Sequence, residues 1–424
     1  MSQEKPTASP FNRSAQHDAK RAAILSQAAK LFNYKGSRAT TLQDIAATLG
    51  LTKTSLYYYV KTKEELIYQC YMAALQHHLR QMDAIEEQYD SPLERTRAFF
   101  LSSFDNWLAA QEGRGPHIAA LLEIASLKGP HRKEVEASYI AMFKRLRQYL
   151  RDGVADGSLR PMECTAATRA IIGSVDWVFS WLHKVERNRV QETAEQAFDV
   201  LCRGLYAGRG DYRPASPAVT TPVSQYVHGF DREEQNRLKQ QAFYKAGTWF
   251  FNKQGFNGTS LDEIAEHLNV SKGAFYYHIK NKEDLLYSCY TYSQDAIERI
   301  YDEATALPGS GLEKVAHSCR QVFHLQNSEE GPLIRYNTIT ALPMKRRREI
   351  LERTDASSAR FGSFIRQGID DGSVREVDVK IAQQLIAGAI NASMEIGLWR
   401  RVDDLDSAAY DYFDIFLNGL LPRE

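Results

Sequence analysis

"LTKTSLYYYVKTKEELIYQCY", residues Leu51–Tyr71, returns 219 residues later as "VSKGAFYYHIKNKEDLLYSCY", residues Val270–Tyr290. The two stretches align without a gap and are identical at 10 of 21 positions. The similarity continues upstream at the same offset, and downstream "RDGVADGSLR" (151–160) matches "RQGIDDGSVR" (366–375). A repeat of about 215 residues indicates a duplicated domain, because the units of solenoid proteins are only about 20–50 residues long.

Length and composition are those of a globular protein with more than one domain. The chain has 424 residues, 43% of them hydrophobic and 25% charged, and chains of this length usually divide into domains. No apolar run approaches the roughly 20 residues that span a bilayer, so we expect no membrane contact. The N-terminal "MSQEKPTASPFNRSAQ" lacks the apolar core of a secretory signal and is predicted to be a disordered polar arm.

The five cysteines are an odd number without CxxC spacing. This pattern favours a reducing, cytoplasmic location over a disulfide framework. Cys70 and Cys289 occupy the same place in the two copies of the repeat, and we expect both to be buried helix residues.

The net charge of zero hides two basic segments. Residues 1–63 carry a net charge of +7 and residues 232–282 a net charge of +3, so the remainder of the chain is acidic. Each basic segment contains one copy of the repeated stretch. A local basic patch is the electrostatic signature of a nucleic-acid-binding module, although solvated charged faces are common in other proteins.

Each half of the chain is predicted to be all-helical, since apolar residues recur at helical spacing and no alternating strand pattern is found. Thr41 with Asp44, and Ser260 with Glu263, have the spacing of capping boxes at the start of a short helix. Thr52 and Ser271 are the expected caps of a second short helix. Between the two helices stand Gly50 or Asn269, residue types that tolerate a left-handed backbone.

Two short helices joined by a tight turn form a helix-turn-helix, whose second helix fits the DNA major groove. Its N-terminal residues face base edges, and hydroxyl and ammonium groups around it suit phosphate contacts. The predicted DNA-binding residues in the first copy are Thr41, Thr52, Lys53, Thr54, Ser55, Tyr57, Tyr58, Lys61 and Lys63. In the second copy they are Ser260, Ser271, Lys272, Gly273, Ala274, Tyr276, Tyr277, His278, Lys280 and Lys282.

The patterns "GxxxTTLxDIAxxLGLTKxSLYYYVKTKEEL" and "GFNGTSLDEIAEHLNVSKGAFYYHIKNKEDL" resemble the DNA-binding domain of the TetR family of transcriptional regulators. The first copy departs from the family pattern at Thr54, where glycine is usual. Val60 and Ile279 stand where phenylalanine is usual. The resemblance implies a sequence-specific, ligand-responsive regulator, most simply a repressor, whose partner is double-stranded DNA.

The resemblance also implies the domain organisation. We expect an arm over 1–17, a first helix-turn-helix domain over 18–72, a helical regulatory domain over 73–208 and a linker over 209–231. A second helix-turn-helix domain over 232–291 and a second regulatory domain over 292–424 follow.

Family members act as homodimers through their last two helices, so this chain is expected to form an intramolecular pseudo-dimer. The interface would use residues 164–185, 193–208, 379–400 and 407–421, with Gly173 and Gly388 allowing close helix approach. Because the two heads differ in sequence, for example at Tyr59 and His278, the operator is expected to have non-identical half-sites.

In the family, the regulatory domain holds an apolar effector pocket. The resemblance therefore implies a small effector, which we expect to be aromatic, lipid-like or an acyl-CoA. Aromatic residues at helical spacing are more often core than pocket, whereas amides on apolar stretches need buried partners. The candidate ligand-binding residues are Phe104, Trp107, Leu121, Phe143, Trp177, Phe323, Asn337, Phe361 and Asn391.

Other interpretations stay open at this point. Three pairs could be drawn as metal or acid–base sets: His77 with His78, His117 with Glu123, and His131 with Glu134. No catalytic motif accompanies them, so we expect no catalytic residue, no metal and no cofactor. A non-specific architectural DNA binder would be basic throughout, unlike the acidic regulatory halves. The third alternative is a sensor in which one head has lost DNA binding and two chains dimerise.

Overall fold

The structure is a computed structural model that describes residues 10–121, 124, 127–214, 232–328, 331–394, 399 and 401–423. Within these residues the regular elements are helices, and one isolated β-bridge pairs Tyr206 with Val374. The predicted all-α fold with two consecutive units is therefore confirmed. None of the described helices is long and apolar enough to cross a membrane.

The first unit runs from α1 to α8. Its helices are α1 (Pro10–Ala39), α2 (Leu42–Thr48), α3 (Lys53–Tyr57), α4 (Lys63–Gln88), α5 (Pro92–Gln111), α6 (Gly129–Asp156), α7 (Cys164–Asp176) and α8 (Val190–Arg203). Three 3₁₀ turns, η2 (Val178–Ser180), η3 (Leu182–Lys184) and η4 (Arg187–Arg189), connect α7 to α8.

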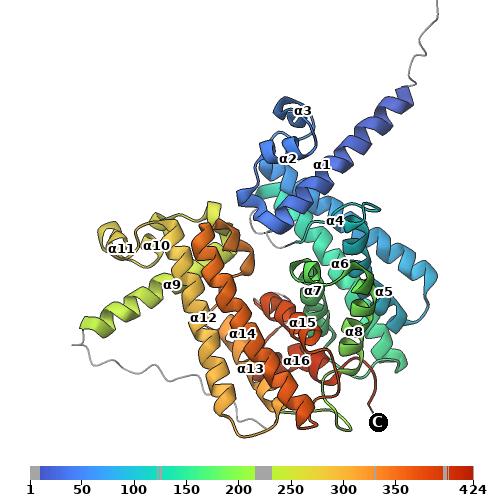
Figure 1. Cartoon of the computed structure of the whole chain (residues 1–424), viewed down its shortest axis with the longest axis vertical. Helices are drawn as coiled ribbons and strands as arrows, with labels where there is room; N and C mark the ends of the chain where they lie inside the picture. The colour runs from blue at the N-terminus through green and yellow to red at the C-terminus, as the bar shows by residue number, and fades with distance from the viewer. Residues whose placement is uncertain are drawn as a thin grey trace, which may run out of the picture.

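The second unit repeats this order. Its helices are α9 (Arg232–Gly258), α10 (Leu261–His267), α11 (Lys272–His278), α12 (Lys282–Ala306), α13 (Gly311–Asn327), α14 (Met344–Asp370), α15 (Val379–Ala392) and α16 (Leu405–Asn418). A 3₁₀ segment, η5 (Tyr336–Ala341), precedes α14. We call α1–α3 the first head and α9–α11 the second head; Figure 1 places them at separate corners of the molecule, at the top and at the left.

The start of the first helix differs from the expectation. α1 already begins at Pro10, inside the range 1–17 predicted to be a disordered arm, and residues 1–9 lie outside the described residues. Gly36 (φ 78°) and Gly255 (φ 69°) interrupt α1 and α9, because a left-handed residue cannot continue a helix. The predicted linker is described only up to residue 214.

Most of the predicted caps are present. Thr41 forms the capping box with Asp44, and the side chains of Thr52 and Ser271 accept hydrogen bonds from the backbone at the start of α3 and α11. The side chain of Ser260 makes no such bond, so the capping box expected with Glu263 is not formed. The turns are as predicted, with φ of 65° at Gly50 and 53° at Asn269.

The two units pack through α7, α8, α15 and α16, the four helices expected at the interface. α7 and α15 cross where two glycines meet. A Cβ on Gly388 would lie 2.7 Å from the carbonyl oxygen of Gly173, and one on Gly173 would lie 3.0 Å from that of Gly388. Only glycine permits such a close backbone approach. Figure 1 shows these helices together, below and between the two heads.

A reciprocal pair of arginines ties each unit to the last helix of the other. Arg160 pairs with Asp414 and donates from Nε to the carbonyl oxygen of Gly419 at 2.6 Å. Arg375, its equivalent in the second unit, pairs with Asp199 at 2.7 Å and donates from Nε to Gly204 at 2.6 Å. The repeated "DGSLR" and "DGSVR" segments therefore hold the interface together.

Hydrophobic packing joins the regulatory halves. One continuous cluster of buried side chains contains residues from α4–α8 and from α12–α16, whereas the second head has a core of its own around Phe251 and Phe275. Cys70 and Cys289 are buried in helices, as expected, and burial raises the pKa of both thiols.

Candidate functional site

The second helix of each helix-turn-helix presents a tyrosine pair to solvent. The exposed fractions are 37% for Tyr57 and 72% for Tyr58, and 43% for Tyr276 and 84% for Tyr277. The opposite side of each helix is apolar, since Leu56 and Phe275 are fully buried. Large apolar rings stay at the surface at a cost in solvation, so a matched exposed pair in both heads favours contact with a partner.

The first basic residue of the helix is held differently in the two heads. In the second head the ammonium group of Lys272 pairs with the carboxylate of Asp262 at 2.6 Å, and Tyr276 donates to the same carboxylate at 3.1 Å. The first head has Gln43 in place of that aspartate, and Lys53 lies 5.7 Å from the ring centre of Tyr57. The two surfaces therefore differ in charge as well as in shape.

Two predicted phosphate contacts have an internal role instead. The ammonium group of Lys63 donates to the carbonyl oxygen of Thr40 at 3.2 Å. That of Lys282 donates to Phe256 and Thr259 at 2.9 and 2.7 Å. Both lysines are half-buried and bind carbonyl groups where the first helix of each head ends, so we reassign them to positioning the head.

The other predicted DNA-binding residues divide by exposure. Lys61 and Lys280 are exposed beside the second helix, as are the small residues at its N-terminus, which are Thr54, Ser55, Gly273 and Ala274. Thr41, Thr52 and Ser271 are also exposed, but their hydroxyl groups already cap helices. Ser260 and His278 are half-buried, and the imidazole of His278 packs against Phe243 with ring centres 5.7 Å apart.

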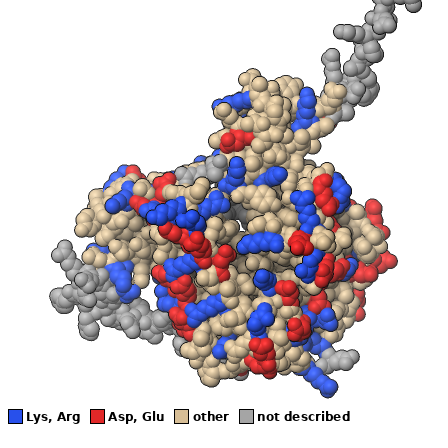
Figure 2. Space-filling model, in the orientation of Figure 1, with Lys and Arg blue, Asp and Glu red and all other residues tan. Residues whose placement is uncertain are grey.

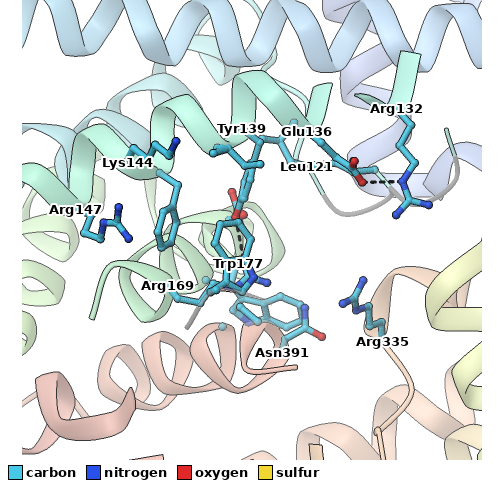
Figure 3. Close-up of a pocket in the computed structure, with 18 residues that line it drawn as sticks. Leu121, Arg132, Glu136, Tyr139, Lys144, Arg147, Arg169, Trp177, Arg335 and Asn391 are labelled. Atoms are coloured by element: carbon cyan, nitrogen blue, oxygen red, sulfur yellow. Dashed lines mark hydrogen bonds and ion pairs between the residues drawn. The ribbon is translucent and has the colours of Figure 1, made fainter. Parts of the chain in front are cut away.

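A cavity of about 480 Å³ lies where the two units meet. It is lined by α6 and α7 of the first unit and by α15, Arg335 and Trp399 of the second. Figure 3 shows Arg335 across from the residues of α6 and α7. The lining residues are Leu121, Ile124, Arg132, Glu136, Tyr139, Ile140, Phe143, Lys144, Arg147, Arg169, Gly173, Asp176, Trp177, Arg335, Gly388, Asn391, Ala392 and Trp399. We call it the seam cavity; its volume is typical of small-molecule sites.

An aromatic wall crosses from one unit to the other. The indole of Trp399 packs on Phe143 with ring centres 4.5 Å apart and edge-on to Tyr139 at 5.8 Å. The guanidinium of Arg169 lies 5.1 Å from the same indole and donates to the hydroxyl of Tyr139 at 2.8 Å. A residue of the second unit thereby completes the wall of a cavity that is mainly built by the first.

Cations outnumber carboxylates in the seam cavity. Five lining residues are Lys or Arg and two are acidic. Glu136 is paired with Arg132 at 2.7 Å, and loss of water contact raises the pKa of Asp176 to about 7. In Figure 2, several Lys and Arg side chains lie near the middle of the face shown, where the two units meet. The cavity combines apolar walls with positive charge, a composition that suits an amphipathic anion.

The structure separates the predicted ligand-binding residues. Leu121, Phe143, Trp177 and Asn391 line the seam cavity, and Trp107 lines a smaller hollow of about 80 Å³. Phe104, Phe323 and Phe361 are buried among other aromatic rings and do not line the seam cavity. We reassign these three to the core, where the same helical spacing is expected. The side chain of Asn337 lies outside the described residues.

The cavity's charged residues were missed because they look like an exposed helix face in the sequence. Arg132, Glu136, Tyr139, Phe143 and Arg147 recur at steps of three or four along α6. That period places all of them on one side of the helix. Aromatic residues that alternate with arginines on one face of α6 were the sequence pattern that could have indicated a binding site.

Each head is tied to its regulatory domain by an asparagine. Asn33 donates to the carbonyl of Ile118 at 2.7 Å and accepts from the amide of Ala120 at 2.9 Å. Asn252 makes the equivalent bonds to Leu333 and Arg335, at 2.8 and 2.9 Å. In both units the segment gripped by the asparagine continues to the seam cavity, which it reaches at Leu121 in one unit and Arg335 in the other.

The η5 segment also contacts both heads. It packs against α1 as well as α9, and Ile339 lies in the core of the second head. Thr340 packs directly against Gly36 of the first head, where any side chain would collide with it. The route from the seam cavity through Arg335 therefore leads to both heads within ten residues.

The histidines considered for a catalytic or metal site have structural surroundings. His77 bonds to Asn106 at 3.0 Å, and His131 stacks on Tyr68 with ring centres 4.2 Å apart. Burial lowers the pKa of His78 to about 4, so this imidazole is neutral near pH 7. His117 donates its backbone amide to Ser26 at 2.9 Å.

The chain matches two family descriptions, each of them twice. "Bacterial regulatory proteins, tetR family" matches residues 24–70 and 244–289. "Tetracyclin repressor-like, C-terminal domain" matches residues 89–205 and 308–399. Both families consist of transcriptional regulators rather than enzymes.

Single-unit regulators are matched by about half of the chain. The HTH-type transcriptional repressor KstR2 of Mycolicibacterium smegmatis is 27% identical over 46% of this chain and 96% of its own length. The fatty acid metabolism regulator protein of Bacillus subtilis is 23% identical over 44% and 98%. The structure of the TetR family regulator PfmR from Thermus thermophilus aligns with 42% of this chain and 95% of its own, at 30% identity and a TM-score of 0.34. With both family descriptions matched in each half, the chain belongs to the TetR family of bacterial regulatory proteins, as a tandem of two units.

Proposed function

We propose that this protein is a ligand-responsive transcriptional repressor that binds its operator as a single-chain pseudo-dimer. The observation that carries the proposal is the packing of α7 and α8 against α15 and α16, with equivalent arginines making reciprocal contacts. This arrangement gives one chain the pair of heads that a family homodimer assembles from two. It would place two helices in major grooves about one helical turn, roughly 34–36 Å, apart.

The operator would have non-identical half-sites. The first head offers Lys53, Thr54 and Ser55 where the second offers Lys272, Gly273 and Ala274. Side chains at the start of the recognition helix face base edges, so these differences change which bases are preferred. The pairing of Lys272 with Asp262 adds a difference in charge that has no counterpart at Gln43. A protein that acts on DNA in this way would work in the cytoplasm.

The effector would be an apolar molecule of the aromatic, lipid-like or acyl-CoA kind, bound in the seam cavity. Aromatic walls and a cationic lining support the lipid-like and acyl-CoA classes. An effector that prefers one arrangement of Arg335 and η5 would shift the population of head positions, because that segment touches α1 and α9. The relatives' names, a fatty acid metabolism regulator among them, agree with this class.

Footprinting on the DNA that flanks the protein's own gene tests the proposal, with Tyr57→Ala and Tyr276→Ala variants in the same titration. Each substitution should cost about 1–3 kcal/mol of binding free energy and weaken protection over its own half-site only. Each variant is thus the control for the other. Met344→Ala, which removes a highly exposed side chain of α14, should leave the protection of both half-sites unchanged.

The mass of the protein–DNA complex distinguishes the pseudo-dimer from a dimer of two chains. One chain per operator is expected for the pseudo-dimer. Two chains per operator, with Tyr57→Ala or Tyr276→Ala having no effect, would instead mean that only one head binds DNA and that chains dimerise.

A further inference from the structure

We propose that the chain binds one amphipathic anion, an apolar body carrying a phosphate or carboxylate group, in the seam cavity. We further propose that the equivalent position of the second unit binds none. The inference rests on the proposed ligand-responsive function and specifies both its ligand chemistry and its stoichiometry. In a homodimer, symmetry imposes two equal cavities, whereas two fused units are free to differ.

The first step is that the cavity belongs to both units. Tyr139, Phe143 and Arg169 come from the first unit, while Arg335 and Trp399 come from the second. The 4.5 Å packing of Trp399 on Phe143 and its 5.1 Å approach to Arg169 close the apolar part. A ligand here would contact the two units at once, so binding would depend on how they sit together.

The second step is the distribution of charge. Lys144 is exposed at the cavity's edge, and the buried Nε of Arg147 has no hydrogen-bond partner among the described residues. Arg335 faces the same space from the opposite unit (Figure 3). Glu136 is engaged by Arg132, and Asp176, with its raised pKa, is only partly ionised near pH 7. An anionic group at the edge and an apolar body inside satisfy this lining.

The third step is the comparison with the second unit at the 215-residue offset. Phe143, Lys144 and Arg147 of α6 correspond to Ser358, Ala359 and Gly362 of α14. The aromatic surface and two of the cations are therefore missing from the second unit.

Two further equivalences point the same way. Arg169 corresponds to Gln384, whose side-chain oxygen accepts a hydrogen bond from the indole of Trp177 at 3.2 Å. Trp399 corresponds to Lys184, whose ammonium group lies 3.9 Å from the carboxylate of Asp355. Where the seam cavity has the guanidinium of Arg169 and the indole of Trp399, the equivalent positions hold an amide and an ammonium group that already contact other protein groups.

The experiment is a calorimetric titration of the full chain with octanoyl-CoA, octanoate and CoA. We expect one molecule of octanoyl-CoA per chain. Lys144→Ala and Arg169→Gln, which install the residues found in the second unit, should each weaken binding about tenfold or more. The exposed control Arg401→Gln should leave it unchanged. Lys144 lies at the surface, so its variant remains informative if Arg169→Gln disturbs packing.

The probes also identify the anionic group. Tighter binding of octanoyl-CoA than of octanoate supports a phosphate-bearing ligand, and equal binding supports a carboxylate. Two equal sites per chain, binding indifferent to both Lys144→Ala and Arg169→Gln, or no saturable binding of any probe would overturn the inference. Footprinting of the same preparation without ligand tests DNA binding separately. Operator protection without ligand binding would leave the proposed repressor function standing, and ligand binding without operator protection would leave the ligand site standing.

Discussion

Replacing Arg160 by Met should separate the two units more severely than the same change at Arg375. The Arg160 and Asp414 side chains are only 6% and 8% exposed, whereas Arg375 and Asp199 are 19% and 32% exposed. Removing Arg160 leaves the Asp414 carboxylate buried, with the amide of Asn418 at 2.8 Å as its remaining donor among the described residues. It also removes the donor to Gly419.

The expected costs follow from this burial. Breaking a buried ion pair by removing one partner costs about 3–5 kcal/mol, because the remaining charge is uncompensated. Arg375 is more accessible to water, so Arg375→Met should cost about 1.5–3 kcal/mol, the range for hydrogen bonds to charged groups. The packing of both side-chain stems is largely kept by methionine.

Urea unfolding of the full chain measures both free energies of unfolding. A double-mutant cycle with Arg160→Met and Asp414→Leu isolates the pair, and the double variant should recover much of the loss because no buried charge remains. A cost below about 1 kcal/mol for Arg160→Met, or equal costs at Arg160 and Arg375, would refute the conclusion that the reciprocal arginines hold the units together by buried charge pairing.

Three further predictions concern DNA, packing and pH. Asp262→Asn removes the carboxylate that binds Lys272 and Tyr276, which leaves both side chains available to DNA. Operator affinity should therefore rise, and its dependence on salt concentration should steepen by about one phosphate contact. Binding titrations at several salt concentrations test this, and an unchanged slope of log affinity against log salt concentration would contradict it. Gly388→Val forces a side chain against Gly173, so small-angle scattering should show the units moving apart; an unchanged profile would mean that the helices adjust without separating. Burial raises the pKa of Asp176 to about 7, so its carboxylate ionises between pH 6 and pH 8 and repels a bound anion. Octanoyl-CoA affinity measured by calorimetry should therefore fall over this pH range, and Asp176→Asn should remove the fall. A fall that persists in the variant would assign the pH dependence to another group.

Much of the DNA-binding fold could be predicted from the sequence because its signals are local. Gly50 and Asn269 adopt the left-handed turn that their residue types favour. The tyrosine pairs stay at the surface while Leu56 and Phe275 pack beneath them, as the helical period requires. Gly173 and Gly388 mark the crossing of the interface helices. The turns and the exposed tyrosine pairs depend on a residue's own backbone or on neighbours within one helical turn, whereas the glycine crossing was expected from the resemblance to the TetR family.

The side-chain partners in the heads could not be predicted in the same way. Lys63 and Lys282 bind carbonyl groups about 23 residues away in sequence, and Lys272 is paired with an aspartate on the preceding helix. A lysine next to a recognition helix has the same sequence pattern whether it faces DNA or a helix end. Only the folded arrangement decides between these partners.

By itself, the sequence determined the duplication, the helical class and both helix-turn-helix motifs, because repeat spacing and helical periodicity are properties of the chain. The helices that join the units were expected from the resemblance to the TetR family. Tertiary structure alone decided that Phe104 is core while Phe143 lines a cavity, and that Trp399 closes that cavity from the other unit. It also placed η5 against both heads. The physical reason is that a cavity and an interdomain contact are made by segments distant in sequence, whose meeting depends on how whole helices pack.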